Sequence, residues 1–239
     1  TAASSREYKV RRTLSFGLIE FASILKKEFL LELLTTFLRD IPTVAIGIFA
    51  NYDRYLKLIE DRKDEFLTYL QNPQKYSEWR LRLTISQQCR KLTQFFQRED
   101  LLEIVKPLTT DKVYTVRKDA AITFSLFMNE QDIEFIKTLS DSSQFYEREE
   151  AANIIEYSSH NWIQEFVKIL QKLSDDHVAN VRIAAAKATK KLIKKFGLNS
   201  DLNNLIKKFE ADSDIDVKKA TEDEIEDDED EEEEEEEND

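Results

Sequence analysis

The 239-residue chain has very little glycine, proline and cysteine: three, three and one residue respectively. Tight hairpin turns and phosphate-binding loops need glycine for positive φ angles and close backbone approach, so both are disfavoured here. The single cysteine, Cys89, excludes a disulfide framework and any cysteine-based zinc site, which fits a reducing compartment. We therefore expect helices joined by short polar turns.

Histidine is also scarce. The two histidines, His160 and His177, stand in different parts of the chain, and neither belongs to a His-Glu pair. Metal-dependent and acid-base enzymes cluster histidine with carboxylates, and the Gly-Asp-x-His and Asn-His-Glu loops of metallophosphatases are missing. Cys89 has no histidine close to it in sequence that would activate its thiol. We expect no catalytic residue, no metal and no cofactor.

Long apolar segments are missing too. No run approaches the roughly 18 apolar residues of a membrane-spanning helix, and the start of the chain lacks a signal-peptide pattern. We expect no membrane partner and a location in the cytoplasm, the nucleus or both. Because the chain starts at Thr1 and its first helical pattern has no partner before it, we also expect the C-terminal part of a longer array.

Negative charge is concentrated at one end of the chain. The net charge is -13, yet residues 222–239 alone hold 16 acidic residues out of 18. The remaining 221 residues carry 35 basic and 32 acidic residues and are nearly neutral. A block of like charge buries too little apolar surface to offset its chain entropy. We expect residues 222–239 to form a disordered acidic tail.

A short pattern recurs along residues 1–221: an Asp, a turn, an apolar residue, an Arg or Lys, and then small residues. The two clearest copies start at Asp111 and Asp176, and in both an Arg (Arg117, Arg182) follows six residues later. Weaker copies place the key position at Arg11, Ala45, Arg80, Arg148 and Lys218, at intervals of 31 to 37 residues. This is the HEAT pattern, whereas the tetratricopeptide and ankyrin signatures are missing. The sequence predicts an all-α solenoid, a superhelix of about seven HEAT-type helical hairpins, with an incomplete first repeat.

Each hairpin is expected to hold a shorter helix A and a longer helix B. Examples are residues 28–39 followed by 42–59, and residues 161–173 followed by 178–196. Pro42 stands where helix B starts, a position that needs no N–H, and Gly197 follows helix B as a C-terminal cap. Stacking of such hairpins buries their apolar faces and leaves a ridge of A-to-B turns for partners.

The repeated Asp and Arg side chains have an expected structural role. We expect Asp111 and Asp176 to accept N–H bonds at the start of helix B. We expect Arg117 and Arg182 to reach the equivalent Asp of an adjacent repeat, forming a ladder. Because Ala45 lacks a guanidinium group, the ladder should be interrupted at the second repeat.

Helix B of the sixth repeat carries five lysines on one face: Lys187, Lys190, Lys191, Lys194 and Lys195. A solvated face is the simplest interpretation. The acidic tail that follows suggests a second one, in which the tail lies against the lysines and screens them from acidic partners. Nucleic-acid binding is disfavoured because the polyanion is adjacent.

Two aromatic residues, Trp79 and Tyr114, fall at or beside expected A-to-B turns. One interpretation is that each packs against its own repeat. The other is that they anchor a partner protein, because Trp, Tyr and Arg are enriched among the residues that dominate interface energetics.

Five runs in this chain carry a resemblance to a known family: residues 7–16, 37–44, 55–58, 79–82 and 176–182. They resemble the C-terminal repeats of the protein phosphatase 4 regulatory subunit 1 family. The scaffold subunit of protein phosphatase 2A is similar in the same places, especially at Trp79-Arg80 and Val113-Tyr114.

The resemblance implies a non-catalytic regulatory or scaffold subunit that binds a serine/threonine phosphatase catalytic subunit of the protein phosphatase 4 or 2A type and directs substrate choice. It nominates Trp79, Arg80, Val113 and Tyr114 as partner-binding residues. The alternative is a HEAT-repeat transport receptor or chaperone-like adaptor whose acidic tail binds basic proteins such as histones.

Overall fold

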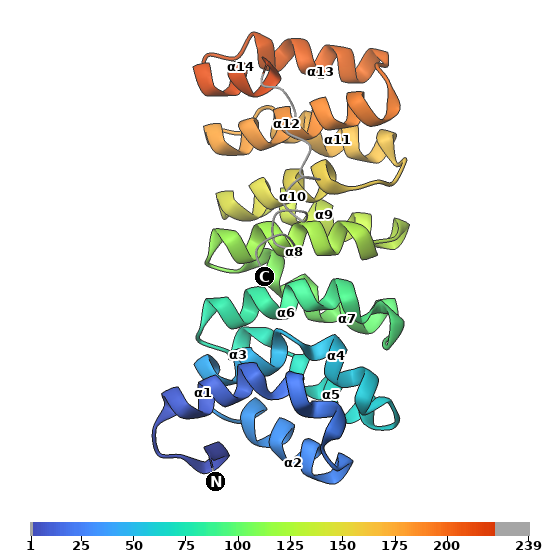
Figure 1. The fold of residues 1–239 in the computed structure, drawn as a ribbon. Coiled ribbons are helices and arrows are strands. Elements are labelled where there is room, and N and C mark those ends of the chain that lie inside the picture. The colour runs from blue at the N-terminus through green and yellow to red at the C-terminus, as the bar shows by residue number, and fades with distance from the viewer. Residues whose placement is uncertain (1, 223–239) are drawn as a thin grey trace. The chain divides into compact units, whose positions relative to one another are not determined.

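The chain is all-α in the computed structural model, which describes residues 2–222. These residues form fourteen α-helices, several short 3-10 helices and no strand, so the expected all-α solenoid is confirmed (Figure 1). The helices group into two compact units, Thr1–Ser159 (unit 1) and His160–Asp239 (unit 2). The expected acidic tail lies outside the described residues, except for Glu222. None of the described helices is long and apolar enough to cross a membrane.

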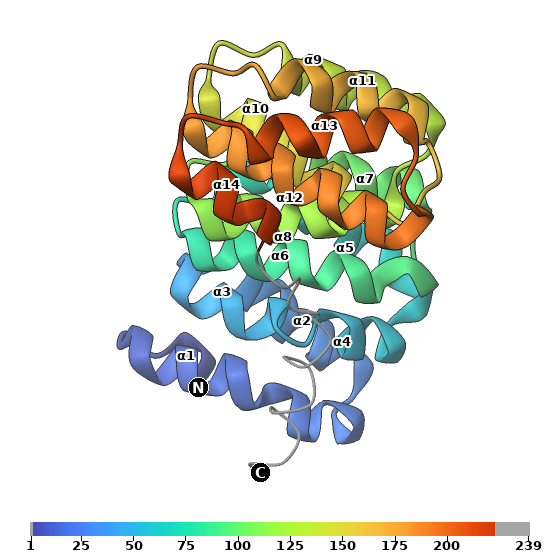
Figure 2. The same ribbon diagram turned by 90° about the horizontal axis from the view of Figure 1, so that it is seen from above.

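Unit 1 is a stack of helical hairpins. Its α-helices are α1 (Tyr8–Gly17), α2 (Lys27–Leu38), α3 (Pro42–Phe49), α4 (Tyr52–Leu58), α5 (Lys63–Leu70), α6 (Trp79–Lys91), α7 (Arg98–Val105), α8 (Tyr114–Phe127), α9 (Ile133–Ser140) and α10 (Phe145–Tyr157). The second helix of each hairpin packs against the second helix of the next, in the order α1, α3, α6, α8 and α10 (Figures 1 and 2). We call these the B helices. The connections include the 3-10 helices η1 (Ala2–Ser4), η2 (Leu18–Ile24), η3 (Glu60–Arg62), η4 (Pro73–Lys75), η5 (Leu92–Gln94), η6 (Lys106–Thr110) and η7 (Glu130–Asp132).

Unit 2 repeats the same arrangement with two hairpins. They are α11 (Ile163–Leu173) with α12 (Ala179–Phe196), and α13 (Ser200–Glu210) with α14 (Ile215–Glu222). The B helices α12 and α14 pack against each other. Gly197 ends α12 with φ at 85°, a backbone conformation that glycine adopts without a Cβ clash. Asn199 then caps α13 by accepting a 2.9 Å hydrogen bond from the Leu202 N–H.

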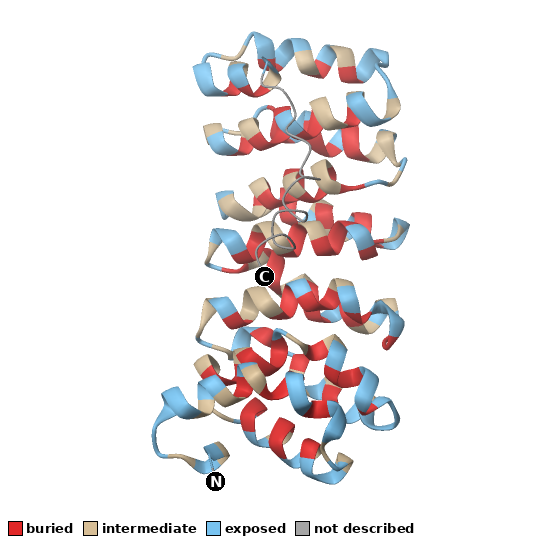
Figure 3. Cartoon of the chain, viewed as in Figure 1, coloured by how far each residue is buried: buried red, intermediate tan, exposed pale blue. Residues whose placement is uncertain are grey.

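The core of each unit is apolar and lies between the stacked helices (Figure 3). Its largest fully buried side chains in unit 1 include Phe37, Phe49, Tyr52, Tyr55 and Phe124, and in unit 2 Phe166 and Phe209. Burying one Leu or Phe side chain contributes about 1.5–3 kcal/mol, so stacking stabilises hairpins that are too small to fold alone.

The helix expected at residues 42–59 is broken in two. Pro42 does start α3, but α3 ends at Phe49 and α4 begins at Tyr52, since Asn51 has non-helical backbone angles. The side chain of Gln88 on α6 spans the break: its amide donates to the Ala50 carbonyl (3.0 Å) and its oxygen accepts from the Asp53 N–H (3.4 Å). Gln88 thus binds, from the next hairpin, two backbone groups beside the break.

Candidate functional site

The first residues of the B helices form one ridge along unit 1. These residues are Tyr8, Pro42, Trp79, Tyr114 and Phe145. Tyr8, Tyr114 and Phe145 expose 45%, 55% and 43% of their surface, and Trp79 is half-buried. Because successive B helices pack side by side, four of the five starting positions place an aromatic residue on the same edge. We call this edge the aromatic ridge.

Trp79 and Arg80 form a stacked pair at the start of α6. The Arg80 guanidinium lies 4.5 Å from the centre of the Trp79 ring, a cation-π contact. The preceding residue, Glu78, accepts a 3.3 Å hydrogen bond from the Arg80 backbone N–H and a 3.4 Å bond from its side chain. Arg80 is exposed, so the pair presents one flat cation-aromatic surface to solvent.

Val113 and Tyr114 stand at the equivalent place in α8. Val113 is the N-terminal cap residue, half-buried, and its N–H donates to the Asp111 carboxylate at 2.9 Å. Tyr114 follows as the first helical residue, and the Arg117 guanidinium lies 5.7 Å from its ring centre. The backbone of this turn is therefore fixed by a buried Asp, while the Tyr114 ring points into solvent.

Phe145 and Tyr8 are members of the ridge that the motif analysis missed. The signal is present in the sequence, since each aromatic stands three residues before a repeat arginine: Tyr8 before Arg11, Trp79 before Arg82, Tyr114 before Arg117 and Phe145 before Arg148. Placing the third repeat's key position at Arg80 hid this regularity.

That placement was wrong, because Arg82 and not Arg80 is the repeat arginine of α6. The Arg82 Nε and Nη2 atoms bind the two Asp111 oxygens at 2.5 and 2.9 Å. Its Nη1 atom donates to the carbonyls of Tyr76 (2.8 Å) and Ser77 (3.2 Å), which end the preceding turn. The hydrogen bond with Asp111 raises the pKa of Arg82 above its usual value. Arg82 thus ties the starts of α6 and α8 together.

The same bidentate contact joins α1 to α3. Arg11 binds Asp40 at 2.5 and 2.9 Å, and this hydrogen bond lowers the pKa of the Asp40 carboxyl. Asp40 also accepts a 2.7 Å bond from the Ile41 N–H. Asp111 differs, because it accepts from the N–H of the residue two positions later. The residue two positions after Asp40 is Pro42, which has no N–H to donate.

The step from α3 to α6 lacks this contact, as the sequence predicts. Ala45 occupies the arginine position of α3 and is buried, and Tyr76 replaces the Asp in the turn before α6. The hydrogen bonds of the neutral Gln88 side chain link α6 to the junction between α3 and α4.

Arg117 departs from the expected ladder. We predicted that it reaches an Asp of the next repeat, but Ser142 stands at that place and accepts the Gln144 N–H instead. The nearest carboxylate to Arg117 is Glu150 on α10, with Nε and Oε2 3.9 Å apart. This distance is too long for a hydrogen bond, so the Arg117 Nε and Glu150 Oε1 atoms are both buried without a partner. Burial raises the pKa of Glu150 to about 8.

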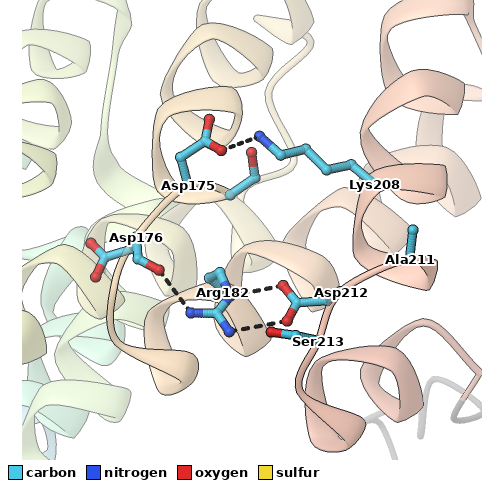
Figure 4. A pocket seen from close by; sticks show the side chains of 8 residues that line it. Asp175, Asp176, Arg182, Lys208, Ala211, Asp212 and Ser213 are labelled. Atoms are coloured by element: carbon cyan, nitrogen blue, oxygen red, sulfur yellow. Dashed lines mark hydrogen bonds and ion pairs between the residues drawn. The ribbon is translucent and has the colours of Figure 1, made fainter.

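In unit 2 the ladder lines an open polar pocket of about 460 Å³ (Figure 4). Asp176 accepts the Val178 N–H at 2.9 Å, and its carbonyl accepts from Arg182 at 2.8 Å. Arg182 binds both Asp212 oxygens at 2.8 and 3.0 Å, and this lowers the pKa of Asp212. Lys208 and Asp175 form an ion pair across the pocket at 2.6 Å. The pocket's charged groups thus bind one another.

The described part of the chain holds no group of three or more His, Cys, Asp or Glu residues that could bind a metal ion. The Cys89 side chain is fully buried, and burial raises the pKa of its thiol to about 12. A thiol of that kind is a poor nucleophile.

The geometry therefore offers a ridge of exposed and half-buried aromatic side chains at helix starts, which is a surface suited to binding proteins. Comparison with known proteins agrees with the resemblance inferred from the repeat motifs. The chain is similar to serine/threonine-protein phosphatase 4 regulatory subunit 1. The human, mouse and rat proteins of that name are each 33% identical to it over 129 residues.

The match covers 49% of this chain and 14% of each phosphatase 4 regulatory subunit. No family model matches the chain. The similarity confirms the resemblance to phosphatase 4 regulatory subunit 1, and it extends over about half of the chain.

Proposed function

We propose that this chain is a non-catalytic regulatory or scaffold subunit of a serine/threonine phosphatase of the protein phosphatase 4 or 2A type. It binds the catalytic subunit through the aromatic ridge and so directs the choice of substrate. The observation that carries the proposal is the similarity to a phosphatase 4 regulatory subunit in a chain where three B helices of unit 1 begin with an exposed aromatic residue and a fourth begins with half-buried Trp79.

The ridge has the physical properties of an interface anchor. Trp, Tyr and Arg side chains contribute most to binding when they enter pockets on a partner, and Trp79, Arg80 and Tyr114 supply all three types. Their backbones are fixed by helix starts, so little conformational entropy is lost when a partner binds. The Arg80 guanidinium already lies over the Trp79 ring, which places a cation and an aromatic face together before binding.

The proposal is tested by measuring the affinity of the chain for a protein phosphatase 4 catalytic subunit. We expect Trp79→Ala or Tyr114→Ala to weaken binding by about 30-fold, the effect of losing a 2 kcal/mol anchor. Phe29→Ala is the matched control, because Phe29 is 47% exposed but lies on α2, away from the ridge. Equal losses for all three variants would contradict a role for the ridge.

The partner's identity is tested separately by purifying the intact protein from its source and identifying the bound proteins by mass spectrometry. A phosphatase catalytic subunit that is retained by wild type and lost with Trp79→Ala supports both partner and site. Recovery of histones without any phosphatase would instead favour the transport or chaperone alternative.

A further inference from the structure

Helix α12 carries an unusually one-sided charge. Its 18 residues, Ala179–Phe196, include six basic residues and no acidic one. Arg182 is used by the Asp212 contact, and the other five are Lys187, Lys190, Lys191, Lys194 and Lys195. Lys187, Lys194 and Lys195 are exposed and the other two are half-exposed. Their spacing places all five on one face of the helix, which we call the lysine face.

The position of the lysine face relative to α14 is set by the repeat. Helix α12 begins three residues after Asp176 and α14 begins three residues after Asp212. The Arg182–Asp212 contact holds these two starts together, and the helices pack along their length. The eight described residues of α14 therefore lie beside the first eight residues of α12, and all five lysines belong to the ten residues that follow.

The end of α14 therefore lies beside the point along α12 where the lysines begin. Glu222 is the last residue of α14, and residues 223–239 hold 15 acidic residues out of 17. Ten helical residues span about 15 Å. Seventeen residues of chain can reach up to about 55 Å, so the acidic segment is long enough to cover the whole face.

The other α-helices of unit 2, α11, α13 and α14, each carry carboxylates as well as lysines. Helix α12 supplies no carboxylate of its own, so it is the place in the described part of unit 2 where positive charge is most concentrated. Charge complementarity therefore favours α12 over the other surfaces of this unit.

We propose that residues 223–239 bind the lysine face of α12 within the same chain and thereby withhold that face from acidic partners. Tethering makes the contact intramolecular, so it forms at a high effective concentration without a shaped pocket. The contact is electrostatic and weakens as salt shortens the Debye length. This proposal does not depend on the identity of any phosphatase.

The contact is tested on the full chain with a nitroxide spin label on Glu236→Cys, since Cys89 is fully buried and is expected to react only when the stack opens. We expect the label to reduce the NMR amide intensities of residues 187–196 to about half or less at low ionic strength, and 0.5 M salt to restore them. Broadening centred on another surface, spread evenly, or unchanged by salt overturns the proposal.

Two matched charge variants locate the contact. Lys187→Gln/Lys191→Gln/Lys194→Gln should abolish the broadening, whereas Lys168→Gln/Lys172→Gln/Lys207→Gln, which removes the same charge from α11 and α13, should preserve it. Equal effects of the two triple variants would mean that only net charge matters, and the proposal would be wrong.

Competition is tested with a fluorescent poly-glutamate peptide as the acidic probe. Replacing Glu231 to Glu237 with Gln in the full chain should tighten peptide binding about tenfold, because the internal competitor is weakened. Unchanged affinity would show that the segment does not withhold the face.

Discussion

Arg117 and Glu150 are the residues at which charge and burial conflict most strongly. Both are buried, they lie 3.9 Å apart, and one polar atom of each lacks a hydrogen-bond partner. Asn153 donates a 3.2 Å bond to the Glu150 carboxyl, but this does not offset the cost of burying a charge. The conflict arises because Ser142 replaces the Asp that would otherwise accept from Arg117 at the turn.

The conflict predicts a pH-dependent stability. The pKa of Glu150 rises from 4.5 to about 8 on folding, so the folded chain retains a proton that the unfolded chain releases. The free energy of unfolding therefore falls as the pH rises from 4.5 to about 8, and the loss is complete above that range. Glu150→Gln should remove this fall and stabilise the chain by on the order of 1 kcal/mol at pH 9, measured by urea unfolding.

At pH 5 the same substitution should change stability by less than about 0.5 kcal/mol, since the native carboxyl is already protonated. Glu134→Gln, at an exposed position of α9, is the control and should leave the wild-type pH profile intact. Parallel profiles for wild type and Glu150→Gln would show that Glu150 ionises normally in the folded chain.

At the scale of the helix, the first turn of a B helix has two separate tasks. In α1, α6, α8 and α10 the first residue is the ridge aromatic, and the fourth residue is an arginine that donates to a carbonyl of the preceding turn. In α6 these are Trp79 and Arg82, with Arg80 exposed between them. Binding and stability should therefore respond to different substitutions within one helical turn.

Arg82→Met should destabilise the chain by about 3 kcal/mol, because it leaves the buried Asp111 carboxylate without its cation. Arg80→Met removes the same charge two residues away and should cost less than about 0.5 kcal/mol. Urea unfolding of both variants measures the difference. Similar losses would place Arg80 in the ladder after all.

The packing of α1 against α3 depends on Gly47. A Cβ atom there would lie 2.5 Å from the Ser15 Oγ and 2.8 Å from the Phe16 backbone nitrogen, which cannot move aside cheaply. Gly47→Ala should therefore destabilise unit 1 by about 1–3 kcal/mol in thermal or urea unfolding. Gly17→Ala is the matched control, since nothing lies within 4 Å of its added Cβ, and it should be neutral or slightly stabilising.

Sequence periodicity predicted the hairpins well where a local signal exists. Pro42 and Gly197 marked a helix start and a helix end because their backbone preferences are intrinsic. The break after Phe49 and the Glu150 partner of Arg117 were not predicted, and at both places the contacting side chain comes from the neighbouring hairpin. Of the four ridge aromatics, the sequence motifs singled out Trp79 and Tyr114, whereas Tyr8 and Phe145 were missed because the two-residue error at Arg80 hid the common spacing.

At the scale of the whole molecule, each hairpin is stabilised chiefly by its neighbours, so local opening of the stack is expected to be measurable. Cys89 is a natural reporter, because it is fully buried in α6 near the middle of unit 1. We expect a thiol reagent at pH 8 to modify native Cys89 only through opening of the stack. Arg82→Met should accelerate the reaction roughly 100-fold, the equivalent of about 2.7 kcal/mol.

The exposed-site variant Arg80→Met provides the control and should react at the wild-type rate. Modification of wild-type Cys89 as fast as a free thiol would contradict its burial.

The number of repeats and their order could be predicted for the whole molecule because the repeat motif recurs at a nearly constant interval in the sequence. The division at Ser159 depends on the density of packing and has no comparable sequence mark.

The missing arginine contact at Ala45 has a mechanical consequence. Bidentate Arg–Asp contacts join α1 to α3 and α6 to α8, whereas α3 and α6 are linked by the neutral side chain of Gln88. Between α8 and α10, Arg117 reaches Glu150 only at 3.9 Å. When unit 1 is pulled from its two ends in an optical trap, we expect the first rupture at one of these two steps, before either bidentate contact yields. A first rupture between α1 and α3 or between α6 and α8 would contradict this mechanical role of the Arg–Asp contacts.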